Sequence, residues 1–259
     1  MPIGSTTSSE LLGHIPFQVS PNGLKYLGIY VSLKFEEMIK KNVDPVVNKI
    51  RIDLQRWSPL SISLLGRVAI IKMNILPRLL YPIQMLPNYF PAKYFKAIHS
   101  MISRFIWKNK RPRLKLEKLH LSVKEGGLSL PNVMYYHWAS QIRYIVEWLK
   151  NDNESTFLDL EANGCGPALS ELPFINGAMS SHEISDNFIV RNTLKSWNQI
   201  RRHFGITTQY SMLAPVYCNP DFTQSCSDVG FRAWKEAGIL KILDLFLGGT
   251  LKSFAQLKI

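Results

Sequence analysis

Cations are concentrated in one short stretch of this 259-residue chain, RFIWKNKRPRLKLEK, which runs from Arg104 to Lys118. The stretch holds seven Lys or Arg residues and one acid, Glu117, and it includes an apolar Phe-Ile-Trp cluster. Lysine and arginine side chains bind phosphate oxygens and release the counterions of a polyanion. Pro112 should stop a helix, so residues 108–115 are predicted to form an extended loop whose cations can reach a ligand. The alternative is a solvated loop whose charge only keeps the protein soluble.

Carboxylate, histidine and cysteine positions form no recognisable catalytic or metal site in this sequence. A two-metal site needs paired carboxylates that hold cations roughly 3.5–4 Å apart. Within residues 1–150 only Glu36 and Glu37 are adjacent, and they point apart on a predicted helix. Cys218 and Cys226 lack the spacing of a zinc module, and neither a phosphate-binding glycine loop nor a nucleophile with a recognisable base occurs. We therefore expect a binding protein with no catalytic residue, no metal and no cofactor.

Positive charge is confined to the first part of the chain. Residues 1–150 contain 22 Lys and Arg against 8 Asp and Glu, a net charge of +14, whereas residues 151–259 contain 9 against 11, a net charge of −2. This asymmetry favours a module that faces a polyanion, joined to one that does not. The apolar content of 46% is enough for a buried core, so the chain is expected to fold.

The sequence also bears on membrane and compartment. Its longest apolar runs fall far short of the roughly 20 residues that span a bilayer, so we expect no membrane partner. The first residues lack the basic and apolar regions of a secretory signal. Three cysteines, an odd and sparse set, favour free thiols in a reducing compartment. An intracellular location is expected, with no choice between nucleus and cytoplasm.

Two short alternating runs in the segment FQVSPNGLKYLGIYV, residues 17–31, flank Pro21-Asn22-Gly23. Asn-Gly between β-forming runs is a strong hairpin signal because both residues tolerate positive φ. We therefore predict a β-hairpin with its turn at Asn22-Gly23, followed by a change to helical periodicity.

Helical periodicity dominates the rest of the chain. Asp44 has the residue type of an N-cap, Ser61 or Ser63 can cap the next helix, and Pro77 and Pro82 should end or bend that helix. Helices are predicted over 35–42, 44–57, from Ser61 or Ser63 to about Pro77, 93–107, 133–150, 184–204 and 230–247, the last with Asp228 as its cap.

Two of these helices have side chains that could bind a ligand. Arg67, Asn74 and Arg78 lie seven and eleven residues along, close to one line on a helix surface, and would give that helix a basic face. The helix over 133–150 carries five aromatic residues, which are more often core than platforms for bases.

Four ordered motifs carry a resemblance to a known family. They are KYLGIYV at 25–31, WSPLSISLLGRVAIIKMNILPRLLY at 57–81, FIWKNKRPRLKLEKL at 105–119 and EGGLSLPN at 125–132. In this order they resemble the reverse transcriptases of LINE-type non-LTR retrotransposons, RNA-directed DNA polymerases. The resemblance covers roughly residues 10–150 and then fades, although FRAWKEAGI at 231–239 is similar to a segment found further along such polyproteins.

The resemblance implies the part of a polymerase that grips nucleic acid, without the residues that catalyse the reaction. In that family the Tyr-Leu-Gly segment lies just past the palm and seats the primer end, and the helices after it form a thumb that grips template and primer. Lys25, Tyr26, Leu27 and Gly28 match the first motif, and the later motifs are matched by Gly66, Arg67, Lys72, Pro77, Trp107, Lys108, Arg111, Gly126, Gly127 and Pro131. The family's catalytic Asp-Asp motif belongs upstream of the hairpin, where the first 25 residues contain no Asp. We expect no polymerase activity, because the magnesium ions would lack ligands.

From these observations we expect a mainly α protein, a helical thumb-like bundle preceded by a short β-hairpin, with a helical tail. The expected domains are a palm-end remnant with the hairpin at 1–34, a basic thumb-like domain at 35–150 and a near-neutral tail with a loop-rich linker at 151–259. The expected partner is an RNA/DNA hybrid or RNA, with a separate or missing palm domain as a further partner. The residues expected to contact nucleic acid are Lys25, Arg67, Lys72, Arg78, Arg104, Lys108, Lys110, Arg111, Arg113 and Lys115, and the primer-grip-like hairpin contributes Tyr26, Leu27 and Gly28.

Two alternatives stay open at the level of sequence. The chain could be a protein-interaction module whose residues 151–259 pack on the absent palm or on another protein, a reading that a large exposed apolar patch around the hairpin would favour. It could also be an unselected product of a truncated transposon copy.

Overall fold

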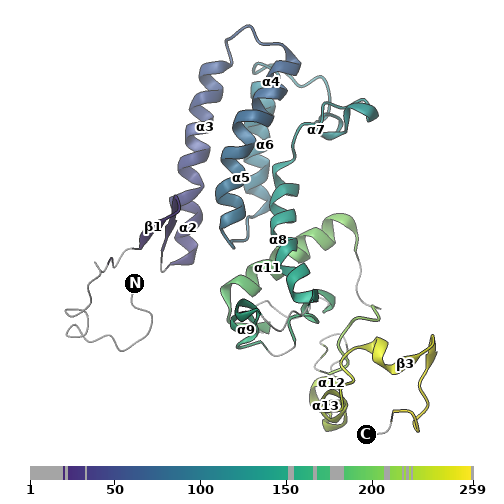
Figure 1. Cartoon of the computed structure of the whole chain (residues 1–259). Coiled ribbons are helices and arrows are strands. Elements are labelled where there is room, and N and C mark those ends of the chain that lie inside the picture. The colour runs from purple at the N-terminus through teal and green to yellow at the C-terminus, as the bar shows by residue number, and fades with distance from the viewer. Residues whose placement is uncertain are drawn as a thin grey trace. The chain divides into compact units, whose positions relative to one another are not determined.

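The computed structural model describes residues 20, 23–32, 34–150, 155–165, 168–175, 184–206, 211–217, 219, 222 and 224–257. The chain divides into two compact units, Met1–Met134 and Tyr135–Ile259, which are described separately below. Helices make up most of the described residues, and two short antiparallel strand pairs complete the secondary structure of this part (Figure 1). This architecture confirms the expected mainly α fold with an N-terminal hairpin.

The hairpin of the first unit joins β1, Leu24–Tyr26, to β2, Ile29–Val31, through the two residues Leu27 and Gly28. Both turn residues have positive φ, 45° and 82°, as a tight two-residue hairpin requires. The expected turn at Asn22-Gly23 is therefore wrong for the observed pair of strands. Asn22 and residues 17–19 of the expected first strand lie outside the described residues. The residues on either side of Leu27-Gly28 form the hairpin instead, and they pair with Tyr26 opposite Ile29.

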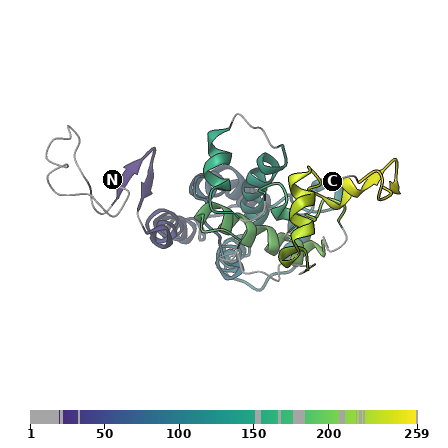
Figure 2. The same ribbon diagram turned by 90° about the horizontal axis from the view of Figure 1, so that it is seen from below.

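A side-chain amide attaches this hairpin to the helices. The Tyr30 amide donates to Asn42 Oδ1 at 2.6 Å, and Asn42 Nδ2 donates to the Tyr30 carbonyl at 2.9 Å. Asn42 thus pairs with β2 as a neighbouring strand would. The Tyr81 hydroxyl donates to the Leu27 carbonyl at the turn. Figures 1 and 2 both show the hairpin beside the end of α2.

The helices of the first unit pack around one core. α3, α5 and α6 run alongside one another (Figure 1), and their apolar faces supply most of the buried side chains, including Ile50, Leu54, Ile98 and Phe105. The helices predicted over 44–57 and 93–107 are therefore confirmed as α3 and α6. Asp44 is the first helical residue of α3 rather than its cap, and its carboxylate accepts from the Tyr94 hydroxyl at 3.0 Å. The bounds are α2 Phe35–Asn42, α3 Asp44–Trp57, α4 Leu64–Ile70, η1 Ile71–Ile75, α5 Leu76–Met85 and α6 Ala92–Ile106.

The helix predicted to begin at Ser61 or Ser63 continues through the prolines that were expected to end or bend it. Ser63 caps α4 by accepting from the Gly66 amide, as predicted, and helical backbone then runs to Met85 with Pro82 inside α5. Between α4 and α5, η1 is a π-helical segment. The wider π turn places an extra residue just before Pro77, and its altered hydrogen-bond spacing accommodates a residue that has no N–H to donate.

The chain after α6 turns back over the first unit. α7 spans Leu116–His120 and η2 spans Val123–Glu125, where Ser122 and Glu125 form a reciprocal capping box. At Gly127, a Cβ atom would lie 2.1 Å from the Leu121 carbonyl oxygen, so only glycine fits this close approach. The EGGLSLPN motif is therefore a packing element of this unit.

The second unit contains the remaining helices and a smaller core. Trp148 is buried there, and its indole Nε1 donates to Glu161 Oε2 at 2.6 Å. Burial raises the pKa of the Glu161 carboxyl. The bounds are α8 Val133–Lys150, which begins within the first unit, α9 Thr156–Ala162, η3 Leu172–Phe174, α11 Phe188–Phe204, α12 Gln224–Ser227, α13 Val229–Glu236, η4 Ile242–Leu245, β3 Phe246–Leu247 and β4 Thr250–Leu251.

The tail differs from the expected helix over 230–247. Asp228 caps α13 as predicted, accepting from the Gly230 amide at 2.8 Å, but the helix ends at Glu236. Gly238 follows with φ of 86°, the left-handed conformation that commonly ends helices. The residues beyond it form η4 and the β3–β4 hairpin. Within the described residues, none of the helices combines the length and apolarity that a membrane crossing requires.

Candidate nucleic-acid interface

Arg67 lies in the interior of the first unit, with 1% of its surface exposed. Its Nη1 donates to the Phe105 carbonyl at 2.8 Å, and its Nη2 donates to the carbonyls of Ser58 at 2.7 Å and Leu60 at 2.9 Å. Its Nε donates to the Ile62 carbonyl at 3.3 Å. The guanidinium therefore joins the end of α3, the α3–α4 connection and the end of α6. Burial lowers the pKa of Arg67 from its usual value.

The expected basic face of Arg67, Asn74 and Arg78 does not form, because Arg67 points inward. Arg78 Nη1 lies 2.8 Å from Asp53 Oδ2 and 3.2 Å from Asn74 Oδ1, so its charge is balanced within the protein. Lys72 is half-buried and its Nζ donates to the Leu128 carbonyl at 3.0 Å. These three cations of the predicted set hold the first unit together.

The end of α6 fixes where the basic loop begins. Lys108 and Asn109 both have left-handed φ, 50° and 59°, and the Asn109 amide donates to the Arg104 carbonyl at 2.8 Å. The Lys110 amide donates to the Trp107 carbonyl at 2.9 Å. This turn reverses the chain directly after the helix, and the Phe105 carbonyl beside it is held by Arg67. The start of the loop is therefore attached to the core by backbone hydrogen bonds and by the buried side chain of Arg67.

The loop from Lys108 to Lys115, named the basic loop hereafter, contains no helix, as Pro112 predicted. All of its residues are exposed, and its five cations are Lys108, Lys110, Arg111, Arg113 and Lys115. Within the described part of the chain none of these five forms an ion pair with a carboxylate. The five loop cations predicted to contact nucleic acid thus lie together and are exposed to solvent.

The hairpin residues of the predicted set lie on a different element. Lys25 and Tyr26 are exposed on β1, and Leu27 is 74% exposed at the turn. Gly28 faces the Tyr81 ring of α5, where a Cβ atom would lie 3.6 Å from a ring carbon. The apolar side chains exposed on the hairpin are those of Leu24, Tyr26 and Leu27.

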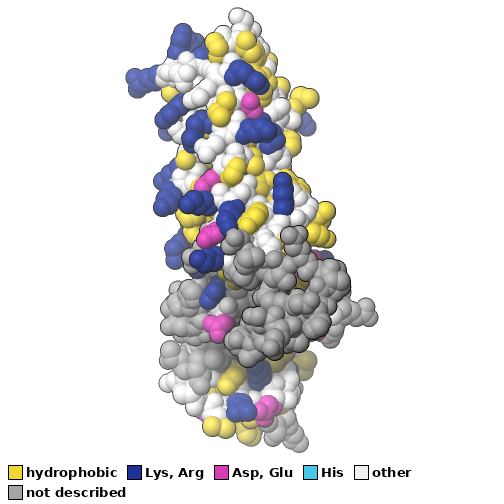
Figure 3. Space-filling model, turned by 90° about the vertical axis from the view of Figure 1, so that its left-hand side faces the viewer, with side chains coloured by type: hydrophobic (Ala, Val, Ile, Leu, Met, Phe, Trp, Pro, Cys, Tyr) yellow, Lys and Arg dark blue, Asp and Glu magenta, His cyan; other side chains and the backbone are white. Residues whose placement is uncertain are grey.

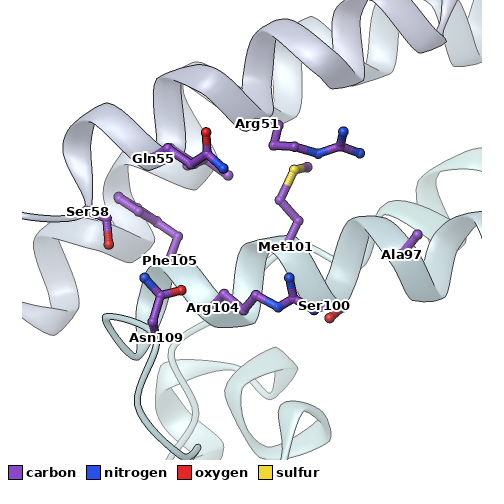
Figure 4. A pocket seen from close by; sticks show the side chains of 10 residues that line it. Arg51, Gln55, Ser58, Ala97, Ser100, Met101, Arg104, Phe105 and Asn109 are labelled. Atoms are coloured by element: carbon purple, nitrogen blue, oxygen red, sulfur yellow. The ribbon is translucent and has the colours of Figure 1, made fainter.

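Arg104, the remaining predicted residue, lines a groove between α3 and α6 of about 420 Å³. It extends from α6, while Arg51 extends from α3 on the facing wall, with Met101 between them (Figure 4). Sequence reasoning missed Arg51 and its neighbour Gln55, one helical turn along. The available signal was that Arg51 and Gln55 lie one turn apart on α3, opposite small residues of α6. This signal can be used only when the pairing of these two helices is already known.

Cations also prevail on the surface of the first unit outside the loop. On the face that carries α2 and α3, Figure 3 shows Lys and Arg side chains along the helices with few Asp and Glu side chains among them. Among the described residues, no group of three or more His, Cys, Asp and Glu side chains could hold a metal ion.

Two histidines lie together inside the first unit. The ring centroids of His99, on α6, and His120, on α7, are 5.8 Å apart, and His120 Nδ1 lies 2.7 Å from the Leu130 carbonyl oxygen. Burial, with a smaller effect of His120, lowers the pKa of His99 from 6.5 to about 4.

We predict that the wild type loses stability relative to the variant His99→Asn as the pH falls. The pKa of His99 is lower in the folded state, so between about pH 6.5 and pH 4 the unfolded state binds a proton that the folded state does not. The stability is fully present above this window and falls by about 2 kcal/mol between pH 7 and about pH 4.5. Urea unfolding of both proteins at the two pH values measures this difference. Parallel pH dependences would contradict it, and comparing the two proteins cancels the contribution of buried acids such as Glu161.

No family model matches this chain. The likeness to LINE-type reverse transcriptases therefore rests on the four ordered motifs. The structure gives a physical reason for several residues of those motifs: Gly66 lies where a Cβ atom would be 2.8 Å from Ile62, Arg67 joins two helix ends, and Gly127 meets the Leu121 carbonyl. These reasons concern folding and do not by themselves indicate an activity.

Proposed function

We propose that this protein binds the backbone of a nucleic acid through the basic loop, without sequence specificity and without catalysis. The observation that carries the proposal is the anchoring of this loop: its five exposed, unbalanced cations begin at a helix end that Arg67 holds through the Phe105 carbonyl. A charge cluster held at a fixed place loses little conformational entropy on binding, whereas a freely moving one loses more.

The ligand class follows from charge and from the resemblance. Lys and Arg side chains grouped on one exposed loop can contact the phosphates of a strand, and such contacts carry no base information. An RNA/DNA hybrid is the preferred ligand, because the family that the motifs resemble grips template and primer with its thumb. The proposal assigns no catalytic role, because no paired carboxylates that could hold metal ions are recognisable in the given sequence.

A salt titration of the full-length protein tests the proposal. Fluorescence anisotropy with a labelled blunt RNA/DNA hybrid should give binding that weakens with salt, with a slope of log K against log salt near −3.6 if four phosphates are met at about −0.9 each. Two hybrids of unrelated sequence should bind with the same affinity. A slope near zero, or no binding at about 50 mM salt, would contradict the proposal and favour the solvated loop.

A further inference from the structure

The groove between α3 and α6 is open to solvent and has a buried apolar floor. Its part nearest the basic loop has a volume of about 420 Å³, and a second part of about 300 Å³ follows along the same two helices. Arg51, Ala97 and Met101 line both parts, so the two parts are adjacent. A volume of this size falls within the range of small-ligand sites, which is about 300–1,000 Å³.

The walls of the groove offer three kinds of contact. Its floor is apolar, formed by the buried Leu54 and Phe105 with the half-buried Met101. Its rim carries hydrogen-bonding side chains, which are Gln55, Ser58, Ser100 and Asn109. Its cations are the exposed Arg51 on α3 and the exposed Arg104 on α6, with Met101 between them (Figure 4). An apolar floor with a polar rim and facing cations suits a ligand that is part aromatic, part polar and part anionic.

The charges in the groove are not balanced at the end nearest the loop. Within the described residues neither Arg51 nor Arg104 forms an ion pair with a carboxylate, and Arg51 Nη1 donates to Asn48 Oδ1 at 3.1 Å. The one acid that lines the groove, Asp44, lies in its second part and accepts from the Tyr94 hydroxyl. An anion is therefore favoured at the end nearest the loop and opposed at the far end.

The groove opens where the basic loop begins. Asn109 belongs to the basic loop and also lines the groove, and Arg104 precedes it by one turn. A strand held by the loop cations would need only a short extension to reach the groove. A duplex cannot enter a cavity of this volume, whereas a single unpaired nucleotide has an aromatic base, a polar sugar and one negative charge.

We infer that the α3–α6 groove binds an unpaired nucleotide of a single-stranded segment that continues from the duplex on the basic loop. The phosphate lies between Arg51 and Arg104, and the base lies against Met101 and the floor formed by Leu54 and Phe105. This inference rests on the proposed function and adds to it the class of ligand: a hybrid with a single-stranded extension.

The test compares two labelled hybrids with the full-length protein, one blunt and one with a short single-stranded extension. The extended hybrid should bind about tenfold tighter, since contacts to one base contribute that order of affinity. In the double variant Arg51→Gln/Arg104→Gln the two affinities should become equal. Ala97→Trp, which fills the groove without removing charge, should have the same effect on the affinity ratio. The matched control is Lys49→Gln/Lys96→Gln, exposed cations of the same helices that do not line the groove, and it should keep the tenfold ratio.

The outcomes separate the groove from the loop. Equal affinity of wild type for both hybrids, or a tenfold ratio that survives both groove variants, overturns the inference and leaves the loop proposal intact. Binding of a single-stranded oligonucleotide that depends on Arg51 and Arg104, without binding of the blunt hybrid, supports the groove and contradicts the loop. If neither probe binds, both fail. Polyglutamate that competes as well as the oligonucleotide at equal charge would also overturn the inference, because the groove would then recognise charge alone.

Discussion

Replacing Arg67 by alanine should lower the free energy of unfolding of the first unit by about 3–5 kcal/mol. The guanidinium donates to four carbonyls, those of Ser58, Leu60, Ile62 and Phe105, and nearly all of it is buried. The variant would leave these acceptors without their donor at a site that water cannot easily enter. It would also remove a positive charge from the carboxyl ends of α3 and α6, where the helix dipoles favour a cation. A loss of this size approaches the whole stability of a small domain.

Two further variants of the full-length protein distinguish this network from a general effect of charge. Arg67→Lys should recover only part of the loss, because one ammonium cannot span carbonyls from two helix ends. Arg56→Ala removes an arginine whose side chain is 70% exposed and which pairs with Asp53 of its own helix, and it should change stability by less than about 0.5 kcal/mol. Urea unfolding followed by circular dichroism measures the size of the effect. Hydrogen exchange should localise it to residues 58–67 and 104–109, and equal stability of Arg67→Ala and Arg56→Ala would refute this network.

Arg67 also shows why regular periodicity misplaced part of the candidate interface. Spacings of seven and eleven residues put Arg67, Asn74 and Arg78 on one line only if every turn contains 3.6 residues. The π-helical segment η1 inserts extra residues per turn between Arg67 and Arg78, so the two positions lie on different faces. Three of the carbonyls around Arg67 come from the nearby residues 58–62, but the fourth comes from Phe105 at the end of α6, which is 38 positions away. Neither the π turn nor this convergence has a local signal.

The features that the sequence did predict depend on short-range physics. Apolar spacing located α3 and α6, and residue type located the cap Asp228 and offered Ser63 as one of two caps for α4. The α8 helix was also predicted, and its buried apolar side chains include Trp138, Ile145 and Trp148. The hairpin was predicted but its turn was not, because Asn22-Gly23 is the stronger turn signal while Leu27-Gly28 is the turn that brings matching strands into register. In the tail, the helix prediction passed over Gly238, whose conformational freedom ends the helix.

The same division applies to the candidate site. The basic loop was recognisable because a cluster of cations and a proline are both local in sequence. The α3–α6 groove was not, because Arg51 and Arg104 stand 53 positions apart and face each other only through the packing of two helices. A site formed by long-range packing becomes visible only when that packing is known.

The largest expected effect on binding comes from the basic loop itself. In the variant Lys108→Asn/Lys110→Ala/Arg111→Ala/Arg113→Ala, the salt slope for a blunt RNA/DNA hybrid should lose about 3.6, since each phosphate contact contributes about −0.9. When the salt concentration rises from 50 to 200 mM, the affinity of the wild type should therefore fall by about 150-fold more than that of the variant. Asparagine is chosen at position 108 because φ there is 50°, a conformation that asparagine tolerates better than alanine.

A control with the same loss of charge decides whether place or net charge matters. The variant Lys40→Ala/Lys49→Ala/Lys96→Ala/Lys124→Ala removes four exposed cations outside the basic loop and lowers the net charge from +12 by the same amount. If binding depends on a backbone held by the anchored loop, this control keeps most of the wild-type slope while the loop variant loses it. Equal losses of salt slope in the two variants would mean that binding depends only on the overall positive charge of the first unit. In that case the anchoring of the loop by Arg67 would have no part in binding.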